Sequence, residues 1–307
     1  NSSPDMSPTA GQMPRLLGLA QASQVFRNEK KINSEKFSVN GNEIAWGTIG
    51  NASTSEGLFW ETFNAAGVMQ VPMVLSVWDD DYGISVHAKY QTTKENISEI
   101  LKGFQKEKDT NGLEIIVVKG WDYVELIEAY QKAEHIAREQ HIPVFIHVTE
   151  LTQPQGHSTS GSHERYKSKD RLDWEREYDC NAQMKKWMIA NGISTEDDLN
   201  QLEKDIKKEV RQGKQSAWIA FGKEAKRESK NLISILNEVV KTSENASFVK
   251  PIINDLESNQ EPLKSILLAC ARKALRYLRY EQFQAKLSLI EWIENFTKTL
   301  QPEFSSH

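Results

Sequence analysis

The sequence lacks the features that mark secreted, membrane-spanning and nucleic-acid-binding proteins. Only two of its 307 residues are cysteine, Cys180 and Cys270, and they show no metal-ligand spacing. We therefore expect two reduced thiols in a cytosolic protein. No apolar run approaches the roughly 20 residues that a membrane-spanning helix needs. Basic residues are outnumbered, 38 against 43, which argues against a nucleic-acid partner because phosphate contacts depend on an excess of Lys and Arg.

What is present is the composition of a globular protein, with 38% hydrophobic and 26% charged residues, in one large or two modest domains. From residue 43 to 151, short β-rich runs alternate with helical periods, which indicates βαβ units around a parallel sheet. Near-continuous apolar strands indicate a sheet that is covered on both faces. We expect strands over 43–49, 71–78, 113–118 and 143–151, and helices over 14–27, 55–70, 95–105 and 122–140.

Beyond residue 170 the strand signals disappear. Charged segments with a helical period predict helices over 171–190, 195–226, 229–243 and 263–300, with loops at 191–192 and 245–262. Residues 152–170 form a long polar loop, and such loops inside a domain are usually functional or disordered. The sequence thus predicts an α/β domain over 1–170, itself incomplete, followed by an all-helical extension over 171–307.

The first loop that could carry a functional site, residues 48–57, follows the first predicted strand. Small residues at Gly50, Ala52 and Ser53 would let a ligand approach free backbone N–H groups. Ser53 and Glu56 have the spacing of a capping box, which predicts that the next helix begins at about Ser53. A helix start of this kind suits a phosphate group, although the same pattern also fits a strand–helix corner without a ligand.

The second loop carries three consecutive carboxylates, Asp79 to Asp81, followed by Tyr82 and Gly83. Carboxylates this close repel one another unless water or a cation lies nearby. One interpretation is a solvated acidic turn closed by Gly83. The other is a divalent ion held against a phosphate, since both loops follow consecutive strands and leave the sheet at its ligand-binding edge. Magnesium usually takes one or two carboxylates together with phosphate and water oxygens.

Considered together, these motifs resemble the α part of the 2-oxo acid dehydrogenase E1 components. Gly50-Asn51-Ala52, a helix, a strand and then Asp80-Asp81-Tyr82-Gly83 are similar to the thiamine-diphosphate motif, Gly-Asp-Gly followed at a distance by Asn. The similarity runs from Ser7 to about Phe221 and includes Gly11-Gln12-Met13-Pro14, residues 50–64 and 144–148, Gly156-His157-Ser158 and Tyr166-Lys167. The resemblance implies a thiamine-diphosphate-binding fold. It also implies oxidative decarboxylation of a 2-oxo acid with acyl transfer to lipoamide, a branched-chain acid such as 2-oxoisovalerate being preferred over pyruvate.

The metal ligands implied by the resemblance depart from the family pattern. The family has Asp at the first position and Asn at the second, whereas this chain has Asn51 first and Asp80 second. The reciprocal exchange still offers one carboxylate and one amide oxygen, so the charge presented to Mg²⁺ is unchanged and we expect a retained site. The main-chain carbonyl of Tyr82 would be the third protein ligand.

The resemblance also implies contacts to thiamine diphosphate. Backbone N–H groups of Ala52 and Ser53 would meet the diphosphate beside Gly50, and Ser7 and Thr9 match backbone contacts near the cofactor. His157 matches a histidine that reaches the diphosphate and the substrate channel, which makes it the candidate catalytic residue; without that match, a loop histidine is usually only solvated. Ser158 matches a position that is phosphorylated in some relatives.

The remaining histidines have no comparable match. We expect His163 at the surface. His135, His141 and His147 lack metal-ligand spacing, and we expect them in a helix, a loop and a strand respectively.

The resemblance further implies partners. In the family, an E1β part supplies a glutamate to the cofactor across an interface, and a lipoyl-bearing E2 component accepts the acyl group. We therefore expect an E1β part, either in the same fused chain, of which this sequence would be a fragment, or as a separate subunit. The expected assembly is a cytoplasmic dimer or heterotetramer-like complex, with helix 263–300 either a connector to the β part or a packing helix. Two alternatives stay open: a non-catalytic interaction or regulatory subunit with a relict thiamine fold, and a transketolase-like carboligase, which the Gly-His-Ser loop disfavours.

Overall fold

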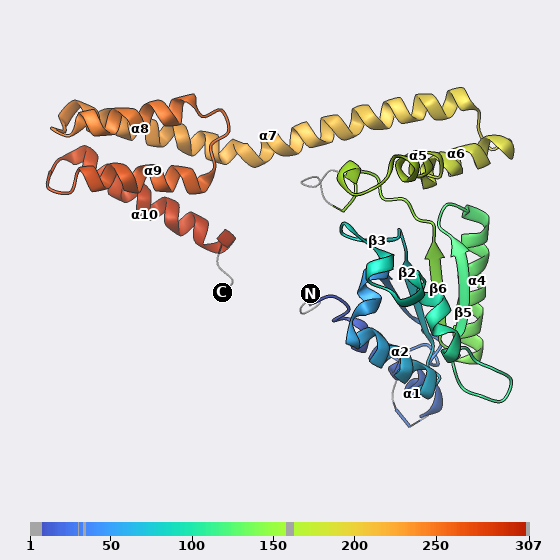
Figure 1. Ribbon diagram of the computed structural model, residues 1–307. Helices are drawn as coiled ribbons and strands as arrows, with labels where there is room; N and C mark the ends of the chain where they lie inside the picture. Colours follow the sequence, from blue (N-terminus) through green and yellow to red (C-terminus); the bar gives the residue numbers. More distant parts are fainter. Residues whose placement is uncertain (1–7, 30, 33–34, 158–162, 305–307) are drawn as a thin grey trace. The chain divides into compact units, whose positions relative to one another are not determined.

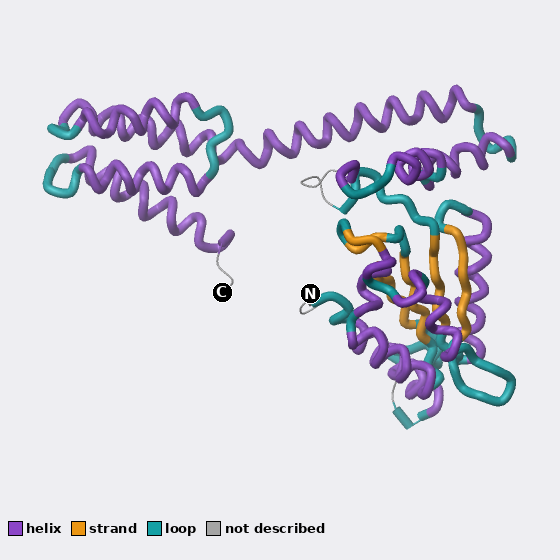
Figure 2. The backbone as a smooth tube through the Cα atoms, viewed as in Figure 1, coloured by secondary structure: helices purple, strands orange, loops and turns teal. Residues whose placement is uncertain are grey.

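The computed structural model describes residues 8–29, 31–32, 35–157 and 163–304 (Figures 1 and 2). The chain forms two compact units, Asn1–Glu196 and Asp197–His307. The predicted domain boundary after residue 170 stays a prediction, and the first compact unit ends at Glu196.

The first unit is built on a four-stranded parallel sheet. Its spatial order is β1-β2-β6-β5, and all four strands lie within a few residues of their predicted positions, which confirms the α/β class. A short antiparallel hairpin follows β2 and was not predicted. The strands are β1 (Ala45–Gly50), β2 (Met73–Trp78), β3 (Tyr82–Gly83), β4 (Val86–His87), β5 (Glu114–Lys119) and β6 (Val144–Thr149).

Helices cover both faces of this sheet, as the apolar strands predict (Figure 1). The α-helices are α1 (Met13–Asn28), α2 (Gly57–Met69), α3 (Ile97–Leu101), α4 (Tyr123–Gln140), α5 (Lys169–Glu177) and α6 (Cys180–Ala190). Short 3₁₀ turns are η1 (Asn51–Ser55), η2 (Ala88–Tyr90), η3 (Thr93–Glu95), η4 (Lys102–Phe104) and η5 (His163–Arg165). The predicted helix 171–190 is in fact two helices that meet at Tyr178–Asp179, where the Asp179 side chain caps α6 by accepting from the Ala182 N–H.

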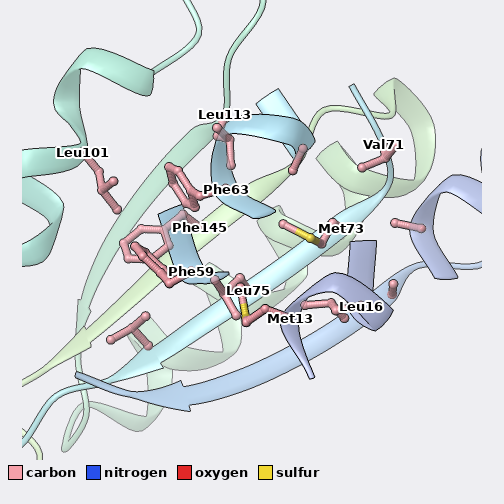
Figure 3. Close-up of a cluster of buried hydrophobic side chains, with 14 of the residues drawn as sticks. Met13, Leu16, Phe59, Phe63, Val71, Met73, Leu75, Leu101, Leu113 and Phe145 are labelled. Carbon is pink, nitrogen blue, oxygen red and sulfur yellow. The ribbon is translucent and has the colours of Figure 1, made fainter. Parts of the chain in front are cut away.

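Alternate residues of the central strands pack into two separate cores, because successive side chains in a strand point to opposite faces. Met73, Leu75 and Val77 of β2 join Phe145 of β6 in the core beneath α1 and α2 (Figure 3). Val74 and the other alternate strand residues face α4 instead: Val118, Val144, Ile146 and Val148. Both central strands are therefore buried on both sides.

The described residues of the second unit form helices joined by short turns, without a strand, which confirms the predicted helical extension. It consists of α7 (Glu196–Thr242), α8 (Ala246–Ser258), α9 (Lys264–Tyr277) and α10 (Gln284–Phe304). The C-terminal half of α7 packs with the other three helices around a core that includes Leu232, Leu236 and Leu267. No helix among the described residues is both long enough and apolar enough to cross a membrane.

Three predictions about this unit are wrong. The predicted helices 195–226 and 229–243 are one continuous helix, α7. The predicted loop 245–262 contains α8, whose Val249, Ile252, Ile253 and Leu256 have helical spacing and are all buried. The predicted helix 263–300 is divided into α9 and α10 by a turn at 278–283.

Candidate functional site

Three loops of the first unit leave the sheet at one edge. The strand register places Gly50 of β1 beside Trp78 of β2, and Trp78 beside Val148 of β6, so these neighbouring strands end at the same level. Strand order reverses where β6 enters the sheet between β2 and β5. Ligands of open α/β sheets bind at the carboxyl edge near such a reversal, and the predicted site residues all belong to segments at this edge or to the N-terminal segment.

A cavity of about 1000 Å³ lies at this edge. It brings together eight of the nine predicted site residues: Thr9, Gly50, Asn51, Ala52, Ser53, Asp80, Tyr82 and His157. The ninth, Ser7, lies outside the described residues, as does Ser158. The remaining lining residues are Glu56, Trp78, Gly83, Ile84, Val86, Gln91, Leu151, Thr152 and Gln153.

The turn after β1 differs from its prediction. The chain forms the 3₁₀ turn η1 from Asn51 to Ser55, and α2 begins only at Gly57 with Glu56 at its N-cap position. Ser53 therefore does not cap α2, and the predicted capping box is wrong. The tight turn lies against the β3 hairpin: a Cβ on Gly83 would lie 2.6 Å from the Cβ of Ala52. The backbone N–H groups of Ala52 and Ser53 therefore belong to a short turn rather than to the start of a long helix.

The three consecutive carboxylates have three different environments, so the interpretation as a uniformly solvated acidic turn is wrong. Asp79 is only 7% exposed, and its Oδ2 lies 2.9 Å from His147 Nε2. Asp81 pairs with Arg171 at 2.5 Å. Asp80 accepts a hydrogen bond from the Tyr82 N–H at 3.2 Å, and it is the member of the three that lines the cavity.

Burial raises the pKa of Asp80 above its ordinary value, and the neighbouring Asp79 adds to the rise. The hydrogen bond from the Tyr82 N–H and the positive charge of Lys167 act in the opposite direction without cancelling it. A carboxylate with a raised pKa is costly to ionise, and a cation in the cavity would lower that cost.

The donors around the cavity fit magnesium in their chemistry. Among the described residues, no three His, Cys, Asp or Glu side chains gather into a metal cluster. The predicted ligands are instead the Asp80 carboxylate, the Asn51 side-chain amide and the Tyr82 carbonyl, and all three residues line the cavity. Oxygen donors with a single carboxylate are what Mg²⁺ takes when phosphate and water complete its coordination.

Charged side chains contact the Tyr82 ring and form ion pairs with one another, an arrangement that the sequence did not predict. The Nζ of Lys167 lies 5.1 Å from the centre of the Tyr82 ring, and the guanidinium of Arg171 lies 5.7 Å from it. Lys167 and Glu175 form a buried ion pair at 2.7 Å, with side chains only 1% and 6% exposed. Arg171 also pairs with Glu175 and donates to the Asp80 carbonyl at 2.9 Å. The acidic turn is thus tied to the segment that follows the 152–170 loop.

His157 is exposed at the rim of the cavity. The preceding Gly156 has a φ of +75°, and a Cβ there would lie 2.4 Å from the Tyr166 hydroxyl oxygen. Tyr166 in turn hydrogen-bonds the backbone of His157; this bond lowers its pKa, but burial outweighs the bond and raises it overall. Tyr166 therefore fixes the backbone from which His157 projects, and Gly156 is required at this approach.

Among the other histidines, His135 lies in α4, His141 in the loop after it and His147 in β6, as predicted. His163, expected at the surface, is only partly exposed, with 19% of its side chain accessible. His147 is a functional candidate that the sequence analysis missed, since it is buried and hydrogen-bonded to Asp79. A histidine within an otherwise apolar buried strand was the signal, because buried polar groups need partners.

Comparison with known proteins shows a family. A family model described as the dehydrogenase E1 component matches residues 4–221, which is more than half of the chain. The chain belongs to the dehydrogenase E1 component family. The resemblance found in the sequence motifs is thereby confirmed at the level of the α-like E1 components of 2-oxo acid dehydrogenases.

Several curated members of this family are similar to the chain at low identity. The pyruvate dehydrogenase E1 component subunit alpha of Rickettsia bellii is 24% identical over 180 residues, which cover 58% of this chain and 52% of that protein. The mitochondrial 2-oxoisovalerate dehydrogenase subunit alpha 1 of Arabidopsis thaliana is 27% identical over 263 residues, 85% of this chain and 48% of its own length. The 2-oxoisovalerate dehydrogenase subunit alpha of Bacillus subtilis is 24% identical over 245 residues, 80% of this chain and 60% of its own. The chain spans about half the length of the first two of these relatives.

Proposed function

We propose that this chain is the α-like part of a 2-oxo acid dehydrogenase E1 and binds thiamine diphosphate with Mg²⁺ in the cavity at the carboxyl edge of the sheet. One observation carries the proposal. Residues from the N-terminal segment and from the loops after β1, β2 and β6 line one cavity, and they include every described residue that the family resemblance assigns to cofactor or metal.

The metal end of the cavity would be formed by Asp80, Asn51 and the Tyr82 carbonyl. Mg²⁺ there would offset the burial that raises the pKa of Asp80 and would hold the diphosphate against the N–H groups of Ala52 and Ser53. When bound, thiamine diphosphate would supply the carbanion chemistry that decarboxylates a 2-oxo acid. The residues of this chain would bind and orient the cofactor and the substrate.

His157 is proposed as the catalytic residue of this chain. Its position at the rim, on a backbone fixed by Tyr166, would let it donate a hydrogen bond to the diphosphate or to a substrate carboxylate entering the cavity. Histidine suits this role because its ring nitrogens can donate near neutral pH.

The substrate is proposed to be a branched-chain 2-oxo acid such as 2-oxoisovalerate rather than pyruvate. The lining of the cavity includes the apolar side chains of Trp78, Ile84, Val86 and Leu151. Burying an aliphatic side chain against such residues would favour the larger substrate. The acyl group would pass to a lipoyl-bearing E2 component, and an E1β part would complete the site. We propose a cytoplasmic dimer or heterotetramer-like assembly.

Titration calorimetry tests the cofactor proposal directly. Thiamine diphosphate is titrated, with and without Mg²⁺, into the chain alone and into the chain combined with an E1β polypeptide. We expect Mg²⁺-dependent binding in at least the combined sample, lost in Asp80→Ala. The matched control is Asp109→Ala, which removes a carboxylate from an exposed turn outside the cavity.

Two results would contradict the proposal, one for the function and one for the metal ligand. Binding to neither sample would favour a relict thiamine fold in a non-catalytic subunit. Binding that Asp80→Ala leaves intact would reject Asp80 as a metal ligand. A lipoamide-dependent assay on the combined sample, with 2-oxoisovalerate and pyruvate compared, then tests the reaction and the substrate preference.

A further inference from the structure

A buried chain of hydrogen bonds lies directly behind the acidic turn. His147 of β6 is 1% exposed; its Nδ1 lies 2.9 Å from Ser98 Oγ and its Nε2 lies 2.9 Å from Asp79 Oδ2. Ser98 and Asp79 are themselves only 5% and 7% exposed. Three segments far apart in the sequence, at α3, β6 and the end of β2, therefore meet at one imidazole.

Hydrogen bonds engage both the side chain and the main chain of Asp79. Its Oδ1 accepts from the Asp81 N–H at 2.8 Å, its own N–H donates to the Val148 carbonyl at 2.9 Å, and its carbonyl accepts from Leu151 at 3.1 Å. A carboxylate accepts hydrogen bonds and does not donate them, so His147 Nε2 is the donor to Oδ2. With both of its oxygens engaged, Asp79 does not face the cavity, and it is absent from the lining.

Asp81, on the other side of Asp80, is held in a comparable way. Its Oδ2 pairs with Arg171, which is anchored in turn by the buried Glu175. Burial lowers the pKa of Arg171, but the two carboxylates outweigh this effect and raise it overall, which keeps the guanidinium charged. Of the three neighbouring carboxylates, Asp79 and Asp81 thus pair with side chains that do not line the cavity, and Asp80 lines it.

We propose that His147 and Arg171 are positioning residues that select Asp80 as the one carboxylate presented to the metal. The inference rests on the proposed function, because it takes the cavity to hold Mg²⁺ with thiamine diphosphate. Freed from His147, the Asp79 carboxylate would compete with Asp80 for the cation or pull the turn out of position. A site built for one carboxylate and one amide oxygen would then change its ligand set.

Two substitutions at His147 separate positioning from general stability. In His147→Gln the amide nitrogen lies about as far from the main chain as Nε2 and can still donate to Asp79. In His147→Asn the shorter amide reaches only the position of Nδ1, towards Ser98. Both variants put an amide into the same buried strand, so their effects on folding are matched, and melting temperatures check this.

The measurement is the Kd of Mg²⁺ at saturating thiamine diphosphate, with the chain combined with an E1β polypeptide. Loss of a residue that orients a metal ligand typically costs about 10- to 100-fold in affinity, and we expect a rise of this size for His147→Asn with near wild-type affinity for His147→Gln. The control is Ser23→Ala, which removes a hydrogen bond from the buried Ser23 hydroxyl to the Glu43 carbonyl, 2.7 Å long, in the same unit but outside the cavity lining. We expect no change in Kd for the control.

Equal Kd values for the Asn and Gln variants would overturn the assignment of His147. Should the two His147 variants fail to fold, Arg171→Gln provides an independent test, since freeing Asp81 is expected to weaken Mg²⁺ binding by the same logic. An unchanged Kd there would overturn the selection of Asp80. Absence of Mg²⁺ and thiamine diphosphate binding by the wild type is a different result: it rejects the proposed function, and this inference with it.

Discussion

The buried pair Lys167–Glu175 provides the sharpest test of how the site is held together. Both side chains are almost fully buried and lie 2.7 Å apart. Removing one partner of such a pair typically costs about 3–5 kcal/mol, because the other charge is left buried. In Lys167→Met, Glu175 keeps its bond to Arg171 at 2.9 Å, so we expect the low end, about 3 kcal/mol.

The corresponding change in melting temperature follows from the size of the unit. The first unit spans 196 residues, and a domain of that size loses about 2–4 °C per kcal/mol. We therefore expect the Tm of this unit to fall by about 6–12 °C in Lys167→Met. The transition of the helical unit, whose core shares no residue with this pair, serves as the internal control in the same calorimetric scan.

A double variant decides whether the cost comes from the unpaired charge. Adding Glu175→Gln to Lys167→Met removes the stranded carboxylate, so the double variant is expected to melt above the single one. A fall of less than about 2 °C in the single variant, roughly 1 kcal/mol or less, would refute the reasoning. So would a double variant whose loss equals the sum of the two single losses.

Three further predictions concern the cavity and the second unit. Gly156→Ala is expected to weaken Mg²⁺–thiamine diphosphate binding in calorimetry while costing only about 1–2 kcal/mol of stability, because the new Cβ displaces Tyr166 and the left-handed backbone is disfavoured for Ala. Asp80→Asn is expected to raise the Tm of the cofactor-free protein at neutral pH. Burial raises the Asp80 pKa, so its contribution to stability is present in acid and is lost as pH rises through that pKa; the gain should vanish in acid, and an equal gain at both pH values would contradict this. Leu232→Ala, at a fully buried position, should cost the helical unit about 2–5 kcal/mol and leave the first unit's transition in place.

The sheet and the position of the cavity could be predicted because they depend on local patterns. Apolar runs such as 71–78 and 143–151 define strands without further information, and consecutive parallel strands must end at one edge. That argument alone brought Gly50 and Asp80 to the same edge of the sheet. The assignment of individual residues to metal and cofactor needed the family resemblance, and it stays a prediction.

Tertiary contacts between side chains could not be predicted. Nothing in the sequence shows that Lys167 and Glu175 will be buried together, and nothing near Asp79 points to His147. The capping box at Ser53 failed for the same reason, since packing of Gly83 against Ala52 accompanies the tight turn at that position. At Ser53, a local sequence preference was overridden by tertiary contacts. The helix α8 was missed differently: its polar and Pro residues outweighed a buried apolar face that the spacing already contained.

The contacts around Asp80 give a physical rationale for the exchange of Asn51 and Asp80 relative to the family pattern. Among the described residues that line the cavity there is no Lys or Arg. Positive side chains that stabilise a buried carboxylate in the cavity must therefore lie outside the lining. Asp80 lies where such a charge exists, because Lys167 lowers its pKa against the effect of burial. Asn51, only 7% exposed in the turn after β1, carries no charge that needs compensation. The carboxylate of the proposed site therefore lies beside the Lys167–Glu175–Arg171 network, and the other side-chain ligand, from the turn after β1, is a neutral amide.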